Sequence, residues 1–530
     1  MHCVIGSGPA GVACASALLR RGATVQLLDG GISLEPSRAE LVARMSQTRP
    51  EDWTNAQLAQ FKTGMEATRR GLPTKLVYGS DFAYRDEERD VRTDYDGVGL
   101  RPSLAVGGLS NVWGAAMMPC RPEDTADWPV NAAQLAEHYR AVLGFIGHSA
   151  RPDDLSGMFP LYTDQPSALD LSTQSRVVLQ VMNRNRERLN ASGIHFGQAR
   201  VAVRTRAPGS DTGCVYCGLC MYGCPYGYIY NSADTLQELR AQERFTYISD
   251  LVVTSLEESA GAVRIRGCHR VTRQPFEREA SRVFLAAGVI PTAQILLRSM
   301  NAYDRQISIK DSQYFLLPMA LTRRVRNVRH EALYGLSQLF IEIMDEKISG
   351  HTVHLQLYSY SELIGRVIAG ALGPLAKPLD FLARELEGRL MLAQGFLHSN
   401  ESPCIFARLS KSGRTSEDRF ELRAEANPGT NRTIRRVVRA LMKNARRIGA
   451  LPLPMLSQIA EPGRSFHSGG TFPMRTHPGA FESDTLGRPN GWKRVHAVDA
   501  TVLPSVPATT ITLPVMANAH RIGWESSSLD

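Results

Sequence analysis

The sequence contains no hydrophobic run long enough to form a membrane span. Its most apolar stretch, residues 363–397, holds only ten consecutive uncharged residues, Val367 to Ala376, whereas a membrane-spanning helix needs about 20. We expect a helix pair there that is buried or lies at a lipid interface. The sequence therefore predicts no membrane span and leaves peripheral membrane contact open.

Signs of secretion are also lacking. Strand-like residues at the N-terminus lead directly into a glycine-rich turn at Gly6 and leave no room for a signal peptide. Nine cysteines, an odd number with four in one tight run, argue against a framework of disulfides. We therefore expect a cytoplasmic protein. The other five cysteines are predicted to be small buried side chains: Cys3, Cys14, Cys120, Cys268 and Cys404.

Long tails of one charge are absent. The net charge is +9, but arginines and lysines are spread in short pairs, so nucleic acid is not expected as a partner. A solvated basic surface is the simplest interpretation, and an anionic substrate, an acidic partner or a membrane surface are the alternatives. The hydrophobic content of 43% is that of a soluble globular protein. The length of 530 residues predicts two domains.

The first thirty residues have the pattern of a dinucleotide-binding unit. A β-run ending at Ile5 leads into Gly6, Gly8 and Gly11, which stand at the spacing G-x-G-x-x-G. A helix and a second strand follow, and that strand ends at Asp29, 21 residues after Gly8, where a carboxylate is expected to bind a ribose. The glycines allow close backbone approach, and the helix N-terminus favours a pyrophosphate. This stretch alone does not distinguish FAD from NAD.

Four cysteines lie within eleven residues in the stretch GCVYCGLCMYGCPYG, residues 213–227. Their spacing, C-x2-C-x2-C-x3-C-P, is that of bacterial iron–sulfur ligation, and glycines with a proline are expected to keep the segment non-helical. Zinc is the main alternative, although structural zinc sites separate their ligand pairs by a longer loop. A redox-active cysteine pair is the third interpretation. The four predicted metal ligands are Cys214, Cys217, Cys220 and Cys224.

Several further segments, in order along the chain, resemble the glucose–methanol–choline (GMC) family of FAD oxidoreductases. The glycine-rich segment AVGGLSNVWG at residues 105–114 and the DWP at 127–129 match the family's loop beside the flavin. VFLAAGVIPTAQILLRS at 283–299 matches the strand, glycine and helix that close its FAD domain. FHSGGTFPM at 466–474 and the segment 495–523 resemble its catalytic and terminal elements.

This resemblance implies an α/β fold in which a Rossmann-like FAD-binding domain is interleaved with an α+β substrate domain, the p-hydroxybenzoate-hydroxylase-like architecture. The FAD domain would comprise residues 1–30, 100–300 and 455–530, with the cysteine run as an insertion at 213–227. The substrate domain would comprise 31–99 and 305–454. Within it, QLFIEIM and HTVHLQLYSY, beginning at Gln338 and His351, are predicted strands.

The resemblance also implies which residues bind the cofactor. No histidine lies between residues 105 and 118, where the family attaches flavin covalently, so non-covalent FAD is expected. Besides Gly6, Gly8, Gly11 and Asp29, the implied cofactor-binding residues are Gly107, Gly108, Ser110, Asn111, Trp113, Asn231, Ala287, Gly288, Asp499 and Ala500.

His467 is the predicted catalytic base. Oxidation of an alcohol by flavin moves a hydride to N5 while a base takes the hydroxyl proton, a task suited to imidazole. The family usually places a second histidine or asparagine near the flavin, but Thr510, or Thr509 in another alignment, stands there in this sequence. Threonine donates a hydrogen bond but is no base near pH 7. A non-oxidative lyase or isomerase is therefore a rival interpretation.

Some GMC dehydrogenases of sugars and polyols carry an iron–sulfur centre in a similar cysteine-rich insertion, and CPYGYIYNS at residues 224–232 resembles the end of theirs. The resemblance implies a dehydrogenase rather than an oxidase, because a cluster is useful for passing electrons to an external acceptor. The cluster would be [4Fe–4S] or [3Fe–4S]. The expected partners are a small alcohol, sugar or polyol and an electron-accepting protein or subunit, such as a cytochrome.

Overall fold

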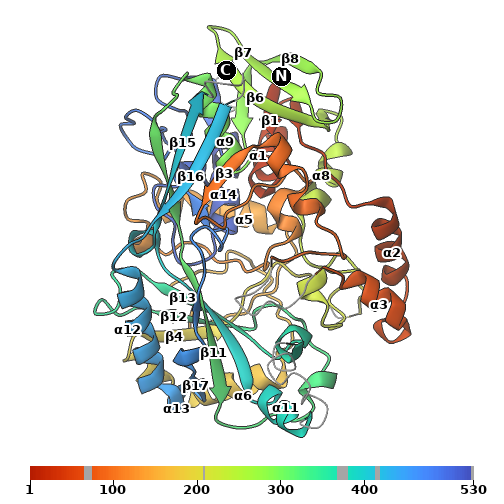
Figure 1. Ribbon diagram of the computed structural model, residues 1–530, viewed down its shortest axis with the longest axis vertical. Helices are drawn as coiled ribbons and strands as arrows, with labels where there is room; N and C mark the ends of the chain where they lie inside the picture. The colour runs from red at the N-terminus through yellow and green to blue at the C-terminus, as the bar shows by residue number, and fades with distance from the viewer. Residues whose placement is uncertain (65–73, 207–208, 367–379, 412–417, 527–530) are drawn as a thin grey trace.

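The computed structural model describes residues 1–64, 74–206, 209–366, 380–411 and 418–526. Two sheet layers lie along its long axis, with the parallel sheet near one end and a large antiparallel sheet near the other (Figure 1). No described helix is both long and apolar enough to cross a membrane. Within the stretch 363–397, predicted as an apolar helix pair, residues 367–379 lie outside the described residues and α11 (Asp380–Glu387) is a helix. The end of the stretch, Leu390–Phe396, is a strand and not a helix, because it pairs with two other strands of a sheet.

The parallel sheet has five strands in the order β20-β9-β1-β2-β5, and all neighbours run parallel. Its central strands are buried at every position, as expected for a parallel sheet covered on both faces. The strand bounds are β1 (His2–Ile5), β2 (Val25–Leu28), β5 (Phe245–Ile248), β9 (Arg282–Leu285) and β20 (Val495–Ala497).

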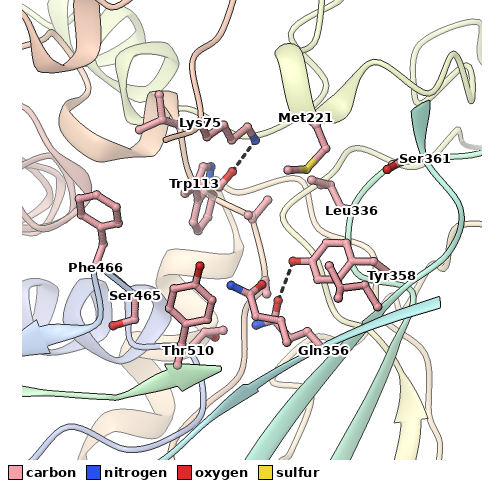
Figure 2. A pocket seen from close by; sticks show the side chains of 18 of the residues that line it. Lys75, Trp113, Met221, Leu336, Gln356, Tyr358, Ser361, Ser465, Phe466 and Thr510 are labelled. Carbon is pink, nitrogen blue, oxygen red and sulfur yellow. Dashed lines mark hydrogen bonds between the residues drawn. The ribbon is translucent and has the colours of Figure 1, made fainter. Parts of the chain in front are cut away.

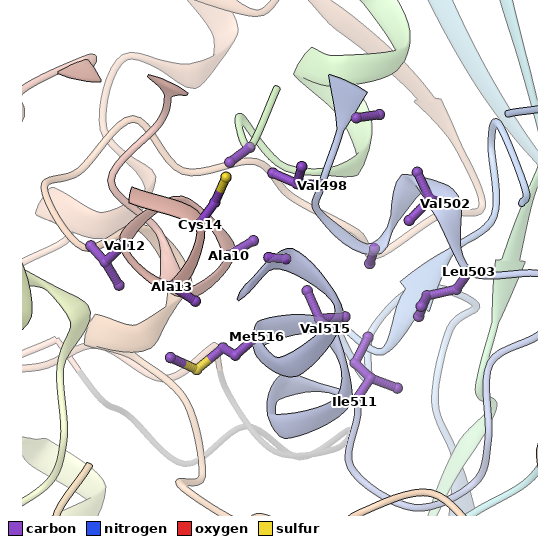
Figure 3. Packing of buried hydrophobic residues seen from close by; sticks show 14 of the residues in the cluster. Ala10, Val12, Ala13, Cys14, Val498, Val502, Leu503, Ile511, Val515 and Met516 are labelled. Carbon is purple, nitrogen blue, oxygen red and sulfur yellow. The ribbon is translucent and has the colours of Figure 1, made fainter. Parts of the chain in front are cut away.

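Two helices with small side chains pack closely beside this sheet. Helix α1 (Pro9–Arg20) lies against α14 (Thr512–Ser526), and Figure 3 shows the apolar residues of both facing one another. A Cβ placed on Gly523 would lie 2.8 Å from the carbonyl oxygen of Cys14. Glycine at this position therefore permits the close approach of the two helices.

Other elements complete this layer. Helices α5 (Ala132–Leu143) and α8 (Ser232–Arg240) contact α14 and α1 respectively. A three-stranded antiparallel sheet, β6 (Leu251–Glu258), β7 (Val263–His269) and β8 (Pro275–Ala280), meets α9 (Val289–Ser299) through β6. These elements enclose the apolar core of the nucleotide-binding half.

The second layer is a seven-stranded sheet in which β18 (Gln458–Ile459) also pairs with β11. The remaining strands, in sheet order, are β17 (Ala450–Pro452), β11 (Tyr314–Leu321), β14 (Leu390–Phe396), β13 (Val353–Tyr358), β12 (Leu339–Ile343) and β4 (Ile194–Gln198). Alternate residues of each strand pack in one apolar cluster with α6 (Thr173–Arg184) and α12 (Thr430–Lys443). The opposite face is therefore free to face the first layer.

A third sheet, β19-β10-β15-β16-β3, joins the two layers. Its strands are β3 (Thr93–Asp96), β10 (Gln306–Asp311), β15 (Cys404–Lys411), β16 (Asp418–Glu425) and β19 (Ser468–Gly469). Shorter helices complete the described chain: α2 (Pro36–Ser46), α3 (Asn55–Phe61), α4 (Glu87–Asp90), α7 (Arg186–Asn190) and α13 (Ala445–Ile448).

The predicted fold class is confirmed: the molecule is α/β, with a Rossmann-like sheet and an interleaved second domain. The two predicted strands of the second domain are β12 and β13. The layers do not follow the predicted domain pieces throughout. β4 lies in the seven-stranded sheet although it belongs to the piece 100–300, and β10 shares the core of the parallel sheet although it belongs to 305–454. β4 and β10 lie where they do because each pairs with strands that are far from it in the sequence.

A buried histidine pair predicts sensitivity to acid. Nδ1 of His138 in α5 lies 2.9 Å from Nδ1 of His520 in α14, and burial lowers their pKa values to about 4 and about 3. The unfolded chain binds protons at these groups below about pH 6.5, so at pH 5 each histidine should cost about 2 kcal/mol of stability.

Replacing His520→Gln removes one titrating group and retains a hydrogen-bonding side chain. We expect the loss of unfolding free energy between pH 7.5 and pH 5 to shrink by about 2 kcal/mol in urea titrations. The exposed His477→Gln is the matched control. An equal pH dependence in the His520→Gln protein would contradict the prediction.

Candidate functional site

Three adjoining cavities, together called the trench, lie from the carboxyl edge of the parallel sheet to the face of the seven-stranded sheet. The first and second share Gly6, Asp29 and Ala287, at the carboxyl ends of three parallel strands. The second and third share Pro9 and Phe466. The third cavity, about 280 Å³, reaches His467 and Thr510. The carboxyl edge of a parallel sheet is where such folds bind nucleotides, and the trench has the elongated form that a dinucleotide needs.

Three helix N-termini open onto the middle of this trench. The first residues of α1, α9 and α14 all line the second cavity, and no acidic residue occupies the first turn of any of them. A Cβ placed on Gly8 or Gly288 would meet nothing within 4 Å. The open space and the positive ends of the helix dipoles together suit a diphosphate.

The glycines at the start of α1 have different structural roles. Gly6 has a φ of +101°, and a Cβ there would lie 2.5 Å from the carbonyl oxygen of Ala286. A Cβ on Gly11 would lie 1.9 Å from the carbonyl oxygen of Gly6. Gly11 is thus required by the close packing of the turn, whereas Gly8 leaves space for a ligand.

Two buried carboxylates hold the loops that border the trench. Asp29 accepts hydrogen bonds from the backbone N–H groups of Ser7 and Gly31, and burial raises its pKa to about 6. Asp499 accepts from the N–H of Gly288 and the hydroxyl of Thr292, at 2.8 and 2.6 Å, and burial raises its pKa. Ala500 lines the trench beside it. Both carboxylates therefore position the glycine turns from within the protein.

The predicted glycine-rich loop is tied to the segment that follows the cysteine run. Asn231 donates to Asn111 at 2.6 Å, and the Ser110 hydroxyl lies 3.0 Å from the Asn231 side-chain oxygen. Trp113 donates its indole N–H to the carbonyl of Tyr230. Gly107 and Gly108 have positive φ values, and Gly108 lines the trench. The polar groups of this loop thus shape the trench wall, and Ser110 and Trp113 line its third cavity.

His467 stands at the far end of the trench. Its ring stacks on Phe396 of β14 with centroids 5.0 Å apart. Its Nδ1 is buried and has no hydrogen-bond partner among the described residues. Burial, and to a smaller degree the neighbouring His354, lower the pKa of His467 to about 4. The imidazole is therefore neutral at physiological pH and can accept a proton.

Of the two predicted threonines, Thr510 lines the same cavity as His467 and Thr509 does not. The Thr510 hydroxyl oxygen accepts a hydrogen bond from the backbone N–H of Met118 at 3.1 Å. Thr509 is fully buried away from it. Two other histidines of the C-terminal region also lie elsewhere: His496 stacks on Phe284, and His520 pairs with His138.

A polar network on β13 was not predicted from the sequence. His354 pairs with Glu342 of β12 at 2.7 Å, Gln356 lies 3.2 Å from the other His354 nitrogen, and Tyr358 donates to Gln356. The simplest assignment has His354 donating to the carboxylate and accepting from Gln356. Its signal in the sequence is the alternation His-x-Gln-x-Tyr, which places all three side chains on one face.

This network reaches the third cavity through Gln356 and Tyr358, and its buried member His354 is a neighbour of His467. Figure 2 shows Gln356 and Tyr358 on one side and Ser465, Phe466 and Thr510 on the other. Glu342 and His354 are fully buried. Their hydrogen bonds therefore hold Gln356 and, through it, Tyr358 in place where these two side chains face the cavity. The cavity therefore offers hydrogen-bonding groups together with a neutral imidazole.

The cysteine run borders the same cavity. Met221, next to Cys220, lines it, and Gly335, another lining residue, donates its N–H to the Cys220 sulfur at 3.3 Å. All six pairs among the four cysteine thiols are near enough to interact electrostatically. As predicted, the segment is mostly irregular, with one short 3-10 turn at Cys220–Tyr222.

Each of the four cysteine sulfurs has a backbone N–H group directed at it. The donors are Tyr216 to Cys214, Leu219 to Cys217, Gly335 to Cys220 and Tyr228 to Cys224. Tyr216, Gly218 and Gly223 have positive φ values. These values turn the backbone so that its N–H groups point toward the sulfurs. Such an arrangement suits sulfur atoms that carry negative charge.

Within the described residues, no group of three or more His, Cys, Asp or Glu side chains is arranged to hold a metal ion. A single zinc ion would draw its thiolates to about 3.8 Å from one another, as bonds of about 2.3 Å require. Burial raises the pKa values of Cys214, Cys217 and Cys220 to about 12, which is unlike a reactive redox thiol. Among the described residues, neither a metal site, whether for zinc or for the predicted iron–sulfur cluster, nor a reactive cysteine pair is thus evident in this geometry.

No model of a protein family matches the chain, and no curated protein matches it in sequence. Many solved structures are similar to it in three dimensions, among them the following two. The pyridoxine 4-oxidase of Mesorbium loti superposes with a TM-score of 0.59 and 15% identity, covering 99% of this chain and 98% of that one. A variant of the formate oxidase of Aspergillus oryzae RIB40, studied for its effect on FAD modification, superposes with a TM-score of 0.59 and 12% identity, covering 100% and 98%. At these identities the likeness establishes a shared fold.

Proposed function

We propose that the protein is a GMC-type FAD oxidoreductase that oxidises the C–OH group of a small alcohol. The observation that carries this proposal is the trench that begins at a dinucleotide-binding turn and ends at the neutral imidazole of His467. The names of the two similar structures, an oxidase of pyridoxine and an oxidase described with FAD, agree with it. Bound FAD would supply the acceptor for the hydride of the alcohol carbon.

The chain's own residues would bind the cofactor and handle the proton. The N–H groups at the starts of α1, α9 and α14 would bind the diphosphate, and Asp29 stands where a ribose hydroxyl is expected. His467 would accept the proton of the substrate hydroxyl. Thr510 would orient that hydroxyl or shape the cavity, because its oxygen is held by the N–H of Met118.

The lining of the third cavity favours an alcohol with a largely apolar body over a free sugar. Leu336, Phe396, Trp113 and Met221 contribute apolar surface. Polar side chains such as Gln356, Tyr358, Gln394 and Ser465 also line it, but apolar surface predominates. A free sugar presents hydroxyls on all sides and would leave several of them without partners against such a wall.

We further propose that the four cysteines hold an iron–sulfur cluster. The four N–H groups directed at the sulfurs, and the compact convergence of the thiols, support a charged cluster over zinc. The cluster would carry electrons away from the cavity that it borders, toward an external acceptor.

These features favour a dehydrogenase over an oxidase and over a lyase. An oxidase transfers electrons directly to oxygen and needs no relay beside its cavity. A lyase or isomerase would need no hydride acceptor at all. The rival assignment as an oxidase rests on the names of the two similar structures.

Visible spectra of the anaerobically purified protein test the proposal. Benzyl alcohol, pyridoxine, sorbitol and D-glucose would be added in turn, and flavin bleaching would be followed before and after admission of oxygen or ferricyanide. We expect bleaching by at least one apolar or aromatic alcohol and faster reoxidation by ferricyanide than by oxygen. Absence of flavin from the protein would overturn the proposal, and faster reoxidation by oxygen would identify an oxidase.

The pKa of His467 predicts the pH dependence of flavin reduction. A base with a pKa of about 4 is about nine-tenths neutral at pH 5, whereas an ordinary histidine is about one-thirtieth neutral there. We therefore expect the rate constant of reduction in stopped-flow experiments to stay nearly constant down to pH 5 and to fall below it. An inflection near pH 6.5 would contradict the assigned environment of His467.

A further inference from the structure

The positive charge of the chain is concentrated on one helical segment. Residues 430–448, which form α12 and α13, contain seven arginines or lysines and no acidic residue, so they alone carry +7 of the net +9. The apolar face of α12, including Ile434, Val437 and Leu441, is buried against the seven-stranded sheet. The charged face is therefore turned to solvent.

Six of these cations are exposed, and within the described residues none of them forms an ion pair. They are Arg432, Arg435, Arg436, Arg439, Lys443 and Arg446. Exposed arginines elsewhere in the molecule commonly pair with carboxylates, as Arg266 does with Glu257 and Glu277. A row of unpaired cations on one helix face attracts a polyanionic surface.

Apolar side chains protrude beside this row. Met442 belongs to α12, and the edge segment that follows α13 through β17 presents Leu451, Met455 and Leu456, of which Met455 is 98% exposed. Strand β17 contacts both α12 and α13. Figure 1 shows α12, α13 and β17 at the end of the molecule away from the parallel sheet. Strand β17 thus places Leu451 next to the two basic helices, and Met455 and Leu456 follow three and four residues after the end of the strand, at the end of the molecule away from the nucleotide-binding turn.

We propose that this surface, residues 430–459, docks the protein onto membranes that contain anionic phospholipids. The cations would meet the lipid phosphates, and the protruding apolar residues would enter the headgroup–acyl boundary. An acidic protein would satisfy the cations but gives no reason for a methionine that is almost completely exposed. A second copy of the chain would bring two +7 surfaces together and is disfavoured by repulsion.

Co-sedimentation of the full-length protein with vesicles tests this docking. Vesicles of phosphatidylcholine alone would be compared with vesicles containing about 30% phosphatidylglycerol, at about 0.1 M and about 0.5 M NaCl. We expect binding only to the anionic vesicles, with a large loss at high salt. The charge-reversal variant Arg435→Glu, Arg436→Glu, Arg439→Glu should bind about 100-fold more weakly.

Two further variants make the outcome decisive. The variant Met455→Ser, Leu456→Ser keeps every charge and should weaken binding about tenfold. The matched control Arg240→Glu, Arg278→Glu, Arg305→Glu changes the same charge at exposed positions outside the surface and should lose much less affinity. Far-UV circular dichroism verifies that each variant is folded. Failure to bind anionic vesicles, or equal losses in the two charge-reversal variants, would overturn the proposal.

Discussion

Replacing His467→Asn is expected to slow flavin reduction by the most active alcohol about 10²- to 10⁴-fold, the usual contribution of a general base. His467 lines the third cavity beside Phe466 and Thr510, and its imidazole is neutral at physiological pH. Asparagine has a similar size and retains a polar side chain but cannot take a proton at neutral pH. Stopped-flow measurement of flavin bleaching under anaerobic conditions gives the rate constant directly.

The matched control is His477→Asn, an exposed histidine ten residues along the chain, which should leave the rate unchanged. The His467→Asn protein should also contain normal amounts of flavin, because His467 lies in the third cavity and not among the helix N-termini. A rate of reduction within about twofold of the original protein would remove His467 from the role of base.

Replacing Cys220→Ser is expected to remove iron and acid-labile sulfide from the protein almost completely. Cys220 is buried, its sulfur accepts the N–H of Gly335, and it directly precedes the cavity-lining Met221 in the chain, so the loss of one thiolate there cannot be replaced by solvent. Ferricyanide turnover should fall at least tenfold, while flavin bleaching by substrate in a single turnover should change little. Iron and sulfide analysis with low-temperature electron paramagnetic resonance provides the measurement.

Two other cysteine variants sharpen this experiment. Cys404→Ser changes a free, half-buried thiol outside the run and should leave the iron content intact. Cys224→Ser distinguishes the two cluster types, because a [3Fe–4S] cluster with three ligands would survive it and a [4Fe–4S] cluster with four would not. Zinc in place of iron in the original protein would refute the cluster assignment.

Local sequence patterns were sufficient for several elements of this fold. The turn from Ile5 to Gly11 was predictable because only glycine tolerates the positive φ of Gly6 and the close contact at Gly11. The irregular cysteine run was predictable because Gly218 and Gly223 also adopt positive φ values. Strands β12 and β13 followed from the apolar runs that they contain.

The boundaries between the layers were not predictable in the same way. β4 pairs with β12 across about 145 residues of sequence, for example Phe196 with Ile341, and no local pattern specifies such a partner. The same holds for β10, which pairs with β15 and β19. Long-range pairing is selected by the packing of whole faces, which a single segment does not encode.

The sequence by itself determined the nucleotide turn, the cysteine spacing and the resemblance to GMC oxidoreductases, because each depends on residues close together in the chain. Only the tertiary structure decided that Thr510 and not Thr509 shares the cavity of His467, and that Gln356 and Tyr358 face it. The tertiary structure also brings the unpaired cations of α12 close to the edge segment that contains the exposed Met455. These relations join residues from separate strands and helices, and they exist only once the apolar faces of those elements have packed.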